Sequence, residues 1–359
     1  MSGTVNGGEV RATADTADTA DTADAADAAN ARDRAWPSAT LLLITYNQRR
    51  FIADAIAGAL AQDYPDLEII VSDDASTDDT FAAAQQALRG YAGPHRVTLR
   101  RNPVNLGISG HLSQLVELSH GELIFVAAGD DISLPTRCRE VAQAWLAHGR
   151  KPDLIATDLI DMDYEGIDHG TIAHSELGIY DGVDRWMAEP PVVIGASHTW
   201  TRRQFERFGP IAPGMISEDQ ITTLRAVLGG GAITLRRPLV RYRRGGVSGK
   251  RKWRTPADFV RRIQLTNRSS LAETLQFIQD AELAGAGDAM RRHKAGKLAR
   301  ETFTRDIFAA TSTGERLRLL FGSRGVRLGH RLRMFLYAAC PGVYAPFFAL
   351  GNLVKGMKG

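Results

Sequence analysis

The stretch "ATLLLITYNQRRFIADAIAGALAQDYPDLEIIVSDDASTDDT", residues 39–80, decides the fold class, and it opens with an apolar run of strand length. The apolar side chains that come next lie at helical spacing: Phe51, Ile52, Ala55, Ile56, Ala59 and Leu60. Residues 66–80 predict a second strand that ends near Val71, then a turn into a second helix with Ser76 and Asp79 at the spacing of a capping box. A strand, a helix and a second strand in this order predict a βαβ unit with parallel strands.

The same alternation continues to residue 128. Residues 95–102 and 121–128 predict two further strands, the second fully apolar, and residues 108–120 between them predict a helix. Strands that alternate with helices of this length predict an α/β fold with a Rossmann-like, mostly parallel sheet and helices on both faces. In such sheets a ligand binds beyond the carboxyl ends of the strands.

The composition is that of an ordinary globular protein. The 359 residues are 44% hydrophobic and 24% charged with a net charge of +3, which gives no indication of nucleic-acid binding. Cys138 and Cys340 lie far apart and form neither a disulfide framework nor a zinc-binding spacing. The N-terminal residues lack the basic region and apolar run of a secretory signal, so we expect a cytoplasmic protein.

Three regions are expected along the chain. Residues 1–36 contain the repeat "TADTADTADTADAAD" at residues 13–27, whose period of three leaves no apolar face on a helix, so this region is predicted to be disordered. Residues 37–250 are the predicted α/β domain. Residues 251–359 are a predicted helical extension, which begins with a helix over residues 257–284.

The end of the chain has the composition of a membrane-surface segment. Leucines alternate with arginines, and an uncharged segment follows over residues 334–354. The arginines are Arg316, Arg318, Arg324, Arg327, Arg331 and Arg333. The uncharged segment is just long enough to cross a bilayer, but prolines and glycines interrupt it, so we expect contact with an anionic inner leaflet rather than a span. A buried helical hairpin that completes the core, or a dimer contact, is the alternative.

Polar residues follow three of the predicted strands, at Thr45–Asn47, Ser72–Ser76 and Ala127–Asp131. If these strands are parallel, all three polar clusters open on the same edge of the sheet. Neither a G-x-G-x-x-G turn nor a Walker-type phosphate loop is present, so phosphates would have to be held in another way.

Asp130 and Asp131 are adjacent carboxylates at the end of the fourth strand. Two like charges raise each other's pKa unless a cation or a set of hydrogen-bond donors offsets them. A divalent cation fits such a pair. The alternative is a solvated turn in which Ser133 caps a helix that starts near Pro135.

These segments resemble the family-two nucleotide-sugar glycosyltransferases, which have the GT-A fold. The resemblance covers roughly residues 39–248 and rests on residues 45–80 of the opening stretch and on four further motifs. These are "NPVNLGISG" (102–110), "AAGDDISLP" (127–135), "GASHTWTRRQFERFGPI" (195–211) and "SEDQITTLRAVLGGG" (217–231).

The resemblance implies a nucleoside pocket. Thr45, Tyr46 and Asp74 would contact the base or ribose of the donor. Arg101 and Asn105 would complete this pocket. The implied donor is a nucleotide sugar, of the UDP type.

The resemblance also places a divalent cation, Mg²⁺ or Mn²⁺, on Asp130 and Asp131, where it would bridge the donor diphosphate. Ala128 stands where the family often has a first Asp, but Mg²⁺ commonly keeps only one or two carboxylates beside phosphates and waters. Downstream, Arg243 or Arg244 would neutralise the leaving phosphates in a loop that often carries His in relatives.

The segment "SEDQ" resembles the family motif whose Asp is the general base. Asp219 would deprotonate the acceptor hydroxyl, and Glu218 would raise the pKa of Asp219 or orient the acceptor. The alternative is a favourable pair of acids in the first turn of a helix over residues 219–228. His198 is expected to be a packed or acceptor-side residue.

The implied reaction is inverting transfer of the sugar to a hydroxyl of a glycan or lipid-linked acceptor, in cell-surface polysaccharide synthesis. A sugar nucleotidyltransferase is an alternative, although it would need a glycine-rich loop after the first strand, which "TYNQRR" lacks. A catalytically idle nucleotide-sugar-binding module at the membrane is another. Acceptor identity would depend on loops over residues 161–191.

Overall fold

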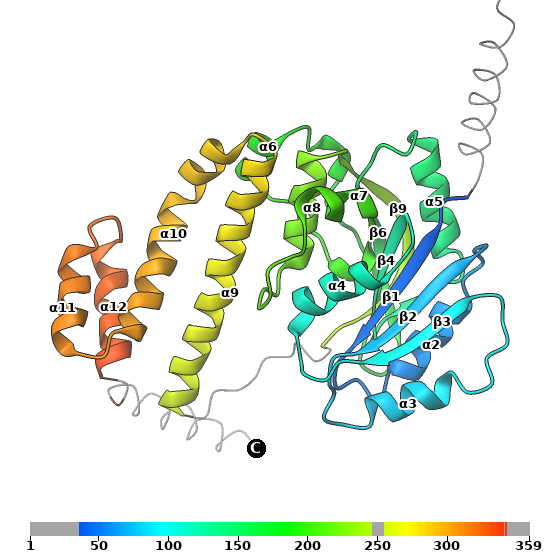
Figure 1. Ribbon diagram of the computed structural model, residues 1–359, viewed down its shortest axis with the longest axis horizontal. Helices are drawn as coiled ribbons and strands as arrows, with labels where there is room; N and C mark the ends of the chain where they lie inside the picture. The colour runs from blue at the N-terminus through cyan, green and yellow to red at the C-terminus, as the bar shows by residue number, and fades with distance from the viewer. Residues whose placement is uncertain (1–35, 246–254, 341, 343–359) are drawn as a thin grey trace, which may run out of the picture. The chain divides into compact units, whose positions relative to one another are not determined.

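The computed structural model describes residues 36–245, 255–340 and 342 (Figure 1). The predicted disorder of residues 1–35 lies outside these residues. So do residues 246–254 of the arginine-containing loop and nearly all of the uncharged segment beyond Cys340.

The predicted elements of the first half are all present. They are β1 (Ala39–Thr45), α2 (Ile52–Leu60), β2 (Leu67–Asp73), α3 (Thr80–Ala87), β3 (Arg96–Arg101), α4 (Gly107–Leu118) and β4 (Leu123–Ala128). The four strands are parallel neighbours in the order β3-β2-β1-β4. This order puts β1 in the centre, so the carboxyl ends of β1, β2 and β4 meet at one edge, as expected.

The sheet continues beyond β4 with mixed strand directions. The remaining elements are β5 (Ile132–Ser133), α5 (Arg137–Ala147), β6 (Leu154–Met162), β7 (Asp168–Ile172), α6 (Val183–Ala188), β8 (His198–Thr201), α7 (Arg202–Phe208), α8 (Glu218–Leu228) and β9 (Ala232–Arg243). The order continues β4-β8-β6-β9-β5, and β7 pairs with β6. The antiparallel pairings are short, whereas β6 and β9 form a long parallel pair.

The expected cap at Ser76 is wrong, and the alternative cap at Ser133 does not form, because each serine hydroxyl has another hydrogen-bond partner. Helix α3 has Asp79 as its N-cap residue without a side-chain cap, and the Ser76 hydroxyl donates to Asp73 at the end of β2 instead. Ser133 lies in β5 and accepts a hydrogen bond from Arg137 at 2.9 Å, so it does not cap α5. Both serines stabilise the turns that follow a strand.

Alternating side chains of the central strand enter two apolar cores. Leu41 and Leu43 of β1 pack with side chains of α2, α3 and α5, such as Ile56 and Trp145. Leu42 faces the other way, into a core that α4, α8 and α9 share. The predicted α/β fold with a mostly parallel sheet and helices on both faces is confirmed.

The C-terminal part is helical, as predicted. Its helices are α9 (Pro256–Leu283), α10 (Gly287–Ala309), α11 (Thr313–Gly322) and α12 (Leu328–Ala339). Figure 1 shows α9 beside α8, with α11 and α12 against α10. Every helix in the described ranges is too short or too polar to cross a bilayer. Because Phe277 and Met290 lie in the same core as Leu42, the domain boundary near residue 250 stays a prediction.

Candidate active site

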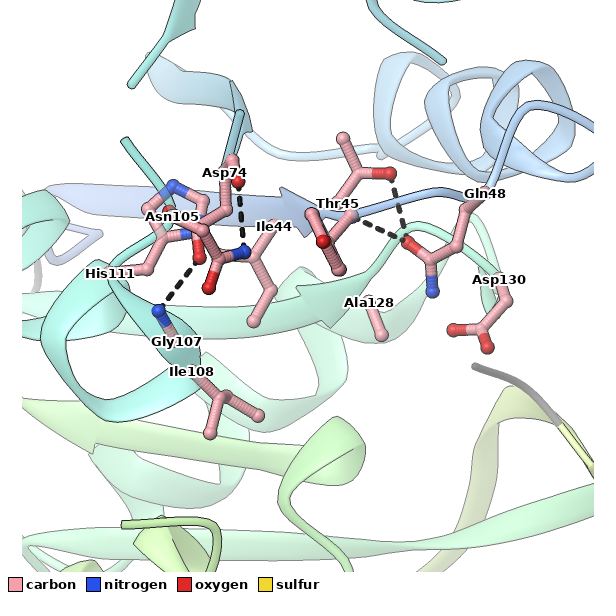
Figure 2. Close-up of a pocket in the computed structure, with 11 residues that line it drawn as sticks. Ile44, Thr45, Gln48, Asp74, Asn105, Gly107, Ile108, His111, Ala128 and Asp130 are labelled. Atoms are coloured by element: carbon pink, nitrogen blue, oxygen red, sulfur yellow. Dashed lines mark hydrogen bonds between the residues drawn. The ribbon is translucent and has the colours of Figure 1, made fainter. Parts of the chain in front are cut away.

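A cavity of about 320 Å³ lies at the carboxyl ends of β1, β2 and β4, where the sequence predicted a ligand site (Figure 2). Its lining residues are Ile44, Thr45, Tyr46, Gln48, Asp74, Asn105, Gly107, Ile108, His111, Ala128 and Asp130. Figure 2 shows Asp74, Asn105 and His111 at one end of the pocket and Gln48 with Asp130 at the other. The pocket therefore has an end formed by β2 and α4 and an acidic end after β4.

Asp74 joins the end of β2 to the start of α4. Its Oδ1 accepts hydrogen bonds from the Asn102 amide at 2.7 Å and from the Leu106 N–H at 2.9 Å, and its Oδ2 accepts one from the Gly107 N–H at 2.9 Å. The Asn105 amide donates to the Asp74 carbonyl at 3.0 Å. Because backbone N–H groups at a helix start favour a carboxylate, Asp74 fixes the wall of the pocket.

His111 closes the same end of the pocket and was not singled out from the sequence. Its Nε2 lies 2.6 Å from the Ser72 hydroxyl, which accepts a hydrogen bond from Arg100 at 2.7 Å. Burial lowers the pKa of His111 to about 4, so the ring is neutral at pH 7. A neutral ring adds no positive charge to this end of the site.

The acidic end is built around Gln48. The Thr45 hydroxyl donates to Gln48 Oε1 at 2.9 Å, and a hydrogen bond from the Gln48 amide favours the charged form of Asp130. Burial has the larger, opposite effect and raises the pKa of Asp130. A Cβ at Gly129 would lie 2.6 Å from Gln48 Oε1, so only glycine lets the turn after β4 come this close to β1.

Asp131 is buried and is not among the residues that line the pocket. Its Oδ1 accepts a hydrogen bond from the Arg243 N–H at 2.8 Å, and Arg243 Nε donates to the Asp130 carbonyl at 3.0 Å. The Arg243 guanidinium also lies 4.3 Å from the centre of the Phe51 ring. The positive group expected beside the two acids is therefore Arg243, which here holds the turn rather than facing the pocket.

The second acidic pair begins α8. Burial raises the pKa of Asp219 to about 6, helped by the charge of Glu273 and opposed by a hydrogen bond from the Gln220 N–H. Burial and the charge of Asp219 raise the pKa of Glu218 to about 8. Glu218 is therefore uncharged over the pH range in which Asp219 titrates. The charge that raises the pKa of Asp219 is that of Glu273, whereas the sequence suggested Glu218 for this effect.

Tyr242 of β9 connects the two acidic pairs electrostatically. Burial and then the charges of Asp131, Asp130 and Asp219 raise the pKa of its phenol. The start of α8 and the turn after β4 therefore lie near the same side chain. No motif in the sequence marked this tyrosine.

The sequence matches the model of "Glycosyl transferase family 2" over residues 40–206. That region contains the pocket. Residues 40–206 are a glycosyl transferase family 2 domain. The predicted family relationship is confirmed for this region.

Curated relatives agree with the family 2 domain. The "Putative glycosyltransferase EpsE" of Bacillus subtilis (strain 168) is 31% identical over 131 residues, which are 36% of this chain and 46% of EpsE. The "Putative colanic acid biosynthesis glycosyl transferase WcaA" of Escherichia coli (strain K12) is 31% identical over 112 residues, 31% of this chain and 38% of WcaA. The matched segment thus spans less than half of either relative.

One similar solved structure is that of S. aureus TarS residues 1–349 in complex with UDP-GlcNAc. It has 15% sequence identity and a TM-score of 0.49, and the similarity covers 84% of this chain and 90% of the TarS chain.

The structure brings together five of the predicted site residues of the family 2 domain: Thr45, Tyr46, Asp74, Asn105 and Asp130. It leaves two predicted donor-binding arginines outside the pocket. Arg101 pairs with Asp73 at 3.1 Å, and Arg244 is exposed and pairs with Asp161. His198 lies fully buried in β8, where burial lowers its pKa to about 3, so it is a packed residue.

Proposed function

We propose that this chain is an inverting glycosyltransferase that moves a sugar from a nucleoside diphosphate donor to an acceptor hydroxyl, in polysaccharide synthesis. The observation that carries the proposal is the arrangement around one pocket. One end of the pocket is polar and suits a nucleoside, and Asp130 lies at the other end. Asp219 lies near Tyr242, as Asp130 does. Together they provide the three functions that such a transfer needs. The names of EpsE and WcaA support the assignment.

The donor would occupy the pocket with its nucleoside against α4. Asn105, Tyr46 and Thr45 supply polar groups, while Ile44 and Ile108 supply an apolar surface for a planar base. We propose a UDP-sugar as the donor, and its diphosphate would lie toward Asp130.

The acidic end of the pocket fits a divalent cation that would be held mainly by the phosphates of the nucleotide sugar. In the described ranges, no group of three or more His, Cys, Asp or Glu side chains could hold a metal. Asp130 lines the pocket as a single carboxylate, and Mg²⁺ typically takes one or two carboxylates plus phosphates and water. When bound, Mg²⁺ or Mn²⁺ would neutralise charge on the leaving diphosphate.

Asp219 would be the general base. A carboxyl with a pKa of about 6 is mostly ionised at pH 7 and still basic enough to accept a proton from an attacking hydroxyl. Protonated Glu218 beside it would limit the negative charge near the acceptor.

A panel of UDP-, GDP- and dTDP-sugars, with and without Mn²⁺, tests this function. We expect one donor to raise the melting temperature only with the cation and to release its nucleoside diphosphate. Pyrophosphate formation from a nucleoside triphosphate and a sugar phosphate would instead identify a nucleotidyltransferase. Binding without turnover, with acceptor extracts present, would identify an idle binding module.

We also propose that the acceptor lies at the cytoplasmic face of a membrane and is a glycan or a lipid-linked glycan. Leu328, Leu332 and Leu336 form an exposed apolar stripe along α12, and the sequence has no Asp or Glu after Glu315. Apolar side chains among arginines suit an anionic lipid surface. Flotation of the full chain with phosphatidylglycerol vesicles should decrease on Leu332→Asp, and an unchanged bound fraction would contradict membrane contact through α12.

A further inference from the structure

Helix α9 presents a row of polar side chains to the segment between Ala212 and Arg225. Glu273, Gln276 and Asp280 are three and four residues apart and so share one face of the helix. Gln276 accepts a hydrogen bond from the Ala212 N–H at 3.1 Å, and Asp280 pairs with Arg225 at 2.8 Å with both side chains fully buried. Helix α9 is therefore fixed to this segment on both sides of Asp219.

Glu273 contacts the start of α8 directly. Its Oε2 accepts a hydrogen bond from the hydroxyl of Ser217, the N-cap residue of α8, and its Oε1 lies 2.7 Å from Lys297 Nζ of α10. The Ser217 side chain makes no cap bond to its own helix, although serine at this position ordinarily does. The hydroxyl thus holds α8 to α9, two residues before Asp219.

Charged and titratable groups surround Asp219 on several elements. Glu218 on α8, Glu273 on α9 and Tyr242 on β9 interact with Asp219 electrostatically. Lys294 and Lys297 on α10 interact with Glu273, and His198 on β8 lies near Thr222 of α8. Glu218, Tyr242 and His198 are neutral near pH 6, because burial shifts the pKa of each toward its uncharged form. Glu273 is the charge that raises the pKa of Asp219, and Lys297 is its ion-pair partner.

We propose that Glu273 is a positioning residue for Asp219. Glu273 holds the start of α8 through Ser217, and its negative charge, which Lys297 partly offsets, acts on the Asp219 carboxyl. This inference rests on the proposed function for the catalytic meaning of Asp219, but its physical content does not depend on turnover. It gives the C-terminal helices a part in the chemistry of the family 2 domain.

The test is a titration of Asp219 in the full chain, read from melting temperatures between pH 4.5 and 8. A carboxyl whose pKa is raised in the folded state stabilises the fold at low pH and loses that contribution as the pH rises through its folded pKa. Wild type should therefore lose melting temperature relative to Asp219→Asn as the pH rises, and this loss should level off near pH 6. The pH at which its slope has fallen to half marks the folded pKa of Asp219 and is called the midpoint below.

Glu273→Gln keeps the shape and an acceptor for Ser217 but removes the charge. The melting temperature of Glu273→Gln is compared with that of the double variant that also carries Asp219→Asn. The midpoint of this difference should lie about 1 pH unit lower than in the wild-type background, which is the size of shift that one nearby charge produces. Lys297→Met removes the offsetting cation and should move it higher. Glu282→Gln is the matched control on the same helix, because Glu282 pairs with Arg291 and should leave the midpoint unchanged.

Opposite shifts for Glu273→Gln and Lys297→Met support the proposal, since a merely structural contact predicts no such pair. An unchanged midpoint in either variant, or a shift as large in Glu282→Gln, overturns it. If Glu273→Gln does not fold, Lys297→Met decides alone. If the shifts appear but Asp219→Asn keeps full turnover, the electrostatic contact stands and the proposed base is wrong.

Discussion

The two acidic pairs of this chain look alike in the sequence and differ in their surroundings. In each pair one acid is buried, Asp131 after β4 and Glu218 at the start of α8. Asp131 receives a hydrogen bond from the Arg243 backbone, whereas Glu218 Oε2 is buried with no hydrogen-bond partner among the described residues. Burial raises the pKa of acids in both pairs. In the first pair, hydrogen-bond donors and arginines oppose this rise, whereas in the second pair the like charge of Glu273 adds to it.

This difference teaches that adjacent acids can serve opposite purposes. Hydrogen-bond donors and a nearby cation favour the ionised form of a carboxylate, which is the form that binds a metal ion. Burial and like charge raise a pKa toward neutrality, which suits proton transfer. The surroundings, more than the residue type, separate the proposed cation ligand Asp130 from the proposed base Asp219.

The largest expected effect is on turnover in Asp219→Asn. An amide keeps the shape of the site but cannot take the proton, so kcat should fall about a hundredfold to ten-thousandfold, or roughly 3 to 5 kcal/mol of barrier. Asp184→Asn is the control, because Asp184 is an exposed acid in the first turn of α6. A rate within a fewfold of wild type would make Asp219 merely a favourable charge at a helix start.

Glu218→Gln tests the other member of the second pair through stability. The raised pKa of Glu218 stabilises the folded state below pH 4.5, and this contribution is lost as the pH rises to about 8. Wild type should therefore lose stability relative to Glu218→Gln across this range, by up to a few kcal/mol, in urea unfolding at several pH values. A difference that does not change with pH would contradict burial of a neutral Glu218.

Gly195→Ala should produce a smaller loss. An added Cβ would lie 2.8 Å from Glu218 Oε1, and the buried carboxyl has little room to move, so we expect about 1 to 3 kcal/mol of destabilisation. Gly296→Ala in α10 meets nothing within 4 Å and should be neutral or stabilising. Equal stability of the two variants in thermal unfolding would show that Gly195 does not pack against Glu218.

The sequence predicts the fold well where the signal is local. Apolar runs gave β1, β2 and β4, and helical spacing gave α2, α4 and α9. The cap expected at Ser76 is wrong and the alternative cap at Ser133 does not form, because each hydroxyl has more than one partner within reach and only the folded chain selects among them.

The candidate site is predictable only in part, for the same reason. Strand-end motifs identified Thr45, Asp74 and Asp130, since parallel strands bring their ends together. Asp130 lines the pocket, whereas Asp131 accepts a hydrogen bond from Arg243, which lies 112 residues away in the sequence. The contact of Glu273 with the start of α8 depends on packing between helices, which no local pattern contains.

Donor binding by three isosteric variants tests the central claim most directly. The donor dissociation constant should be measured by calorimetry, with and without Mn²⁺, for Asp130→Asn, Asp131→Asn and Asp219→Asn. We expect Asp130→Asn to lose the cation-dependent part of donor affinity. Asp131→Asn should keep that part, because its amide oxygen still accepts from the Arg243 N–H, and Asp219→Asn should keep it because a base acts on the acceptor. Equal losses in Asp130→Asn and Asp219→Asn, or full cation dependence in Asp130→Asn, would contradict the division of roles between the two acidic pairs.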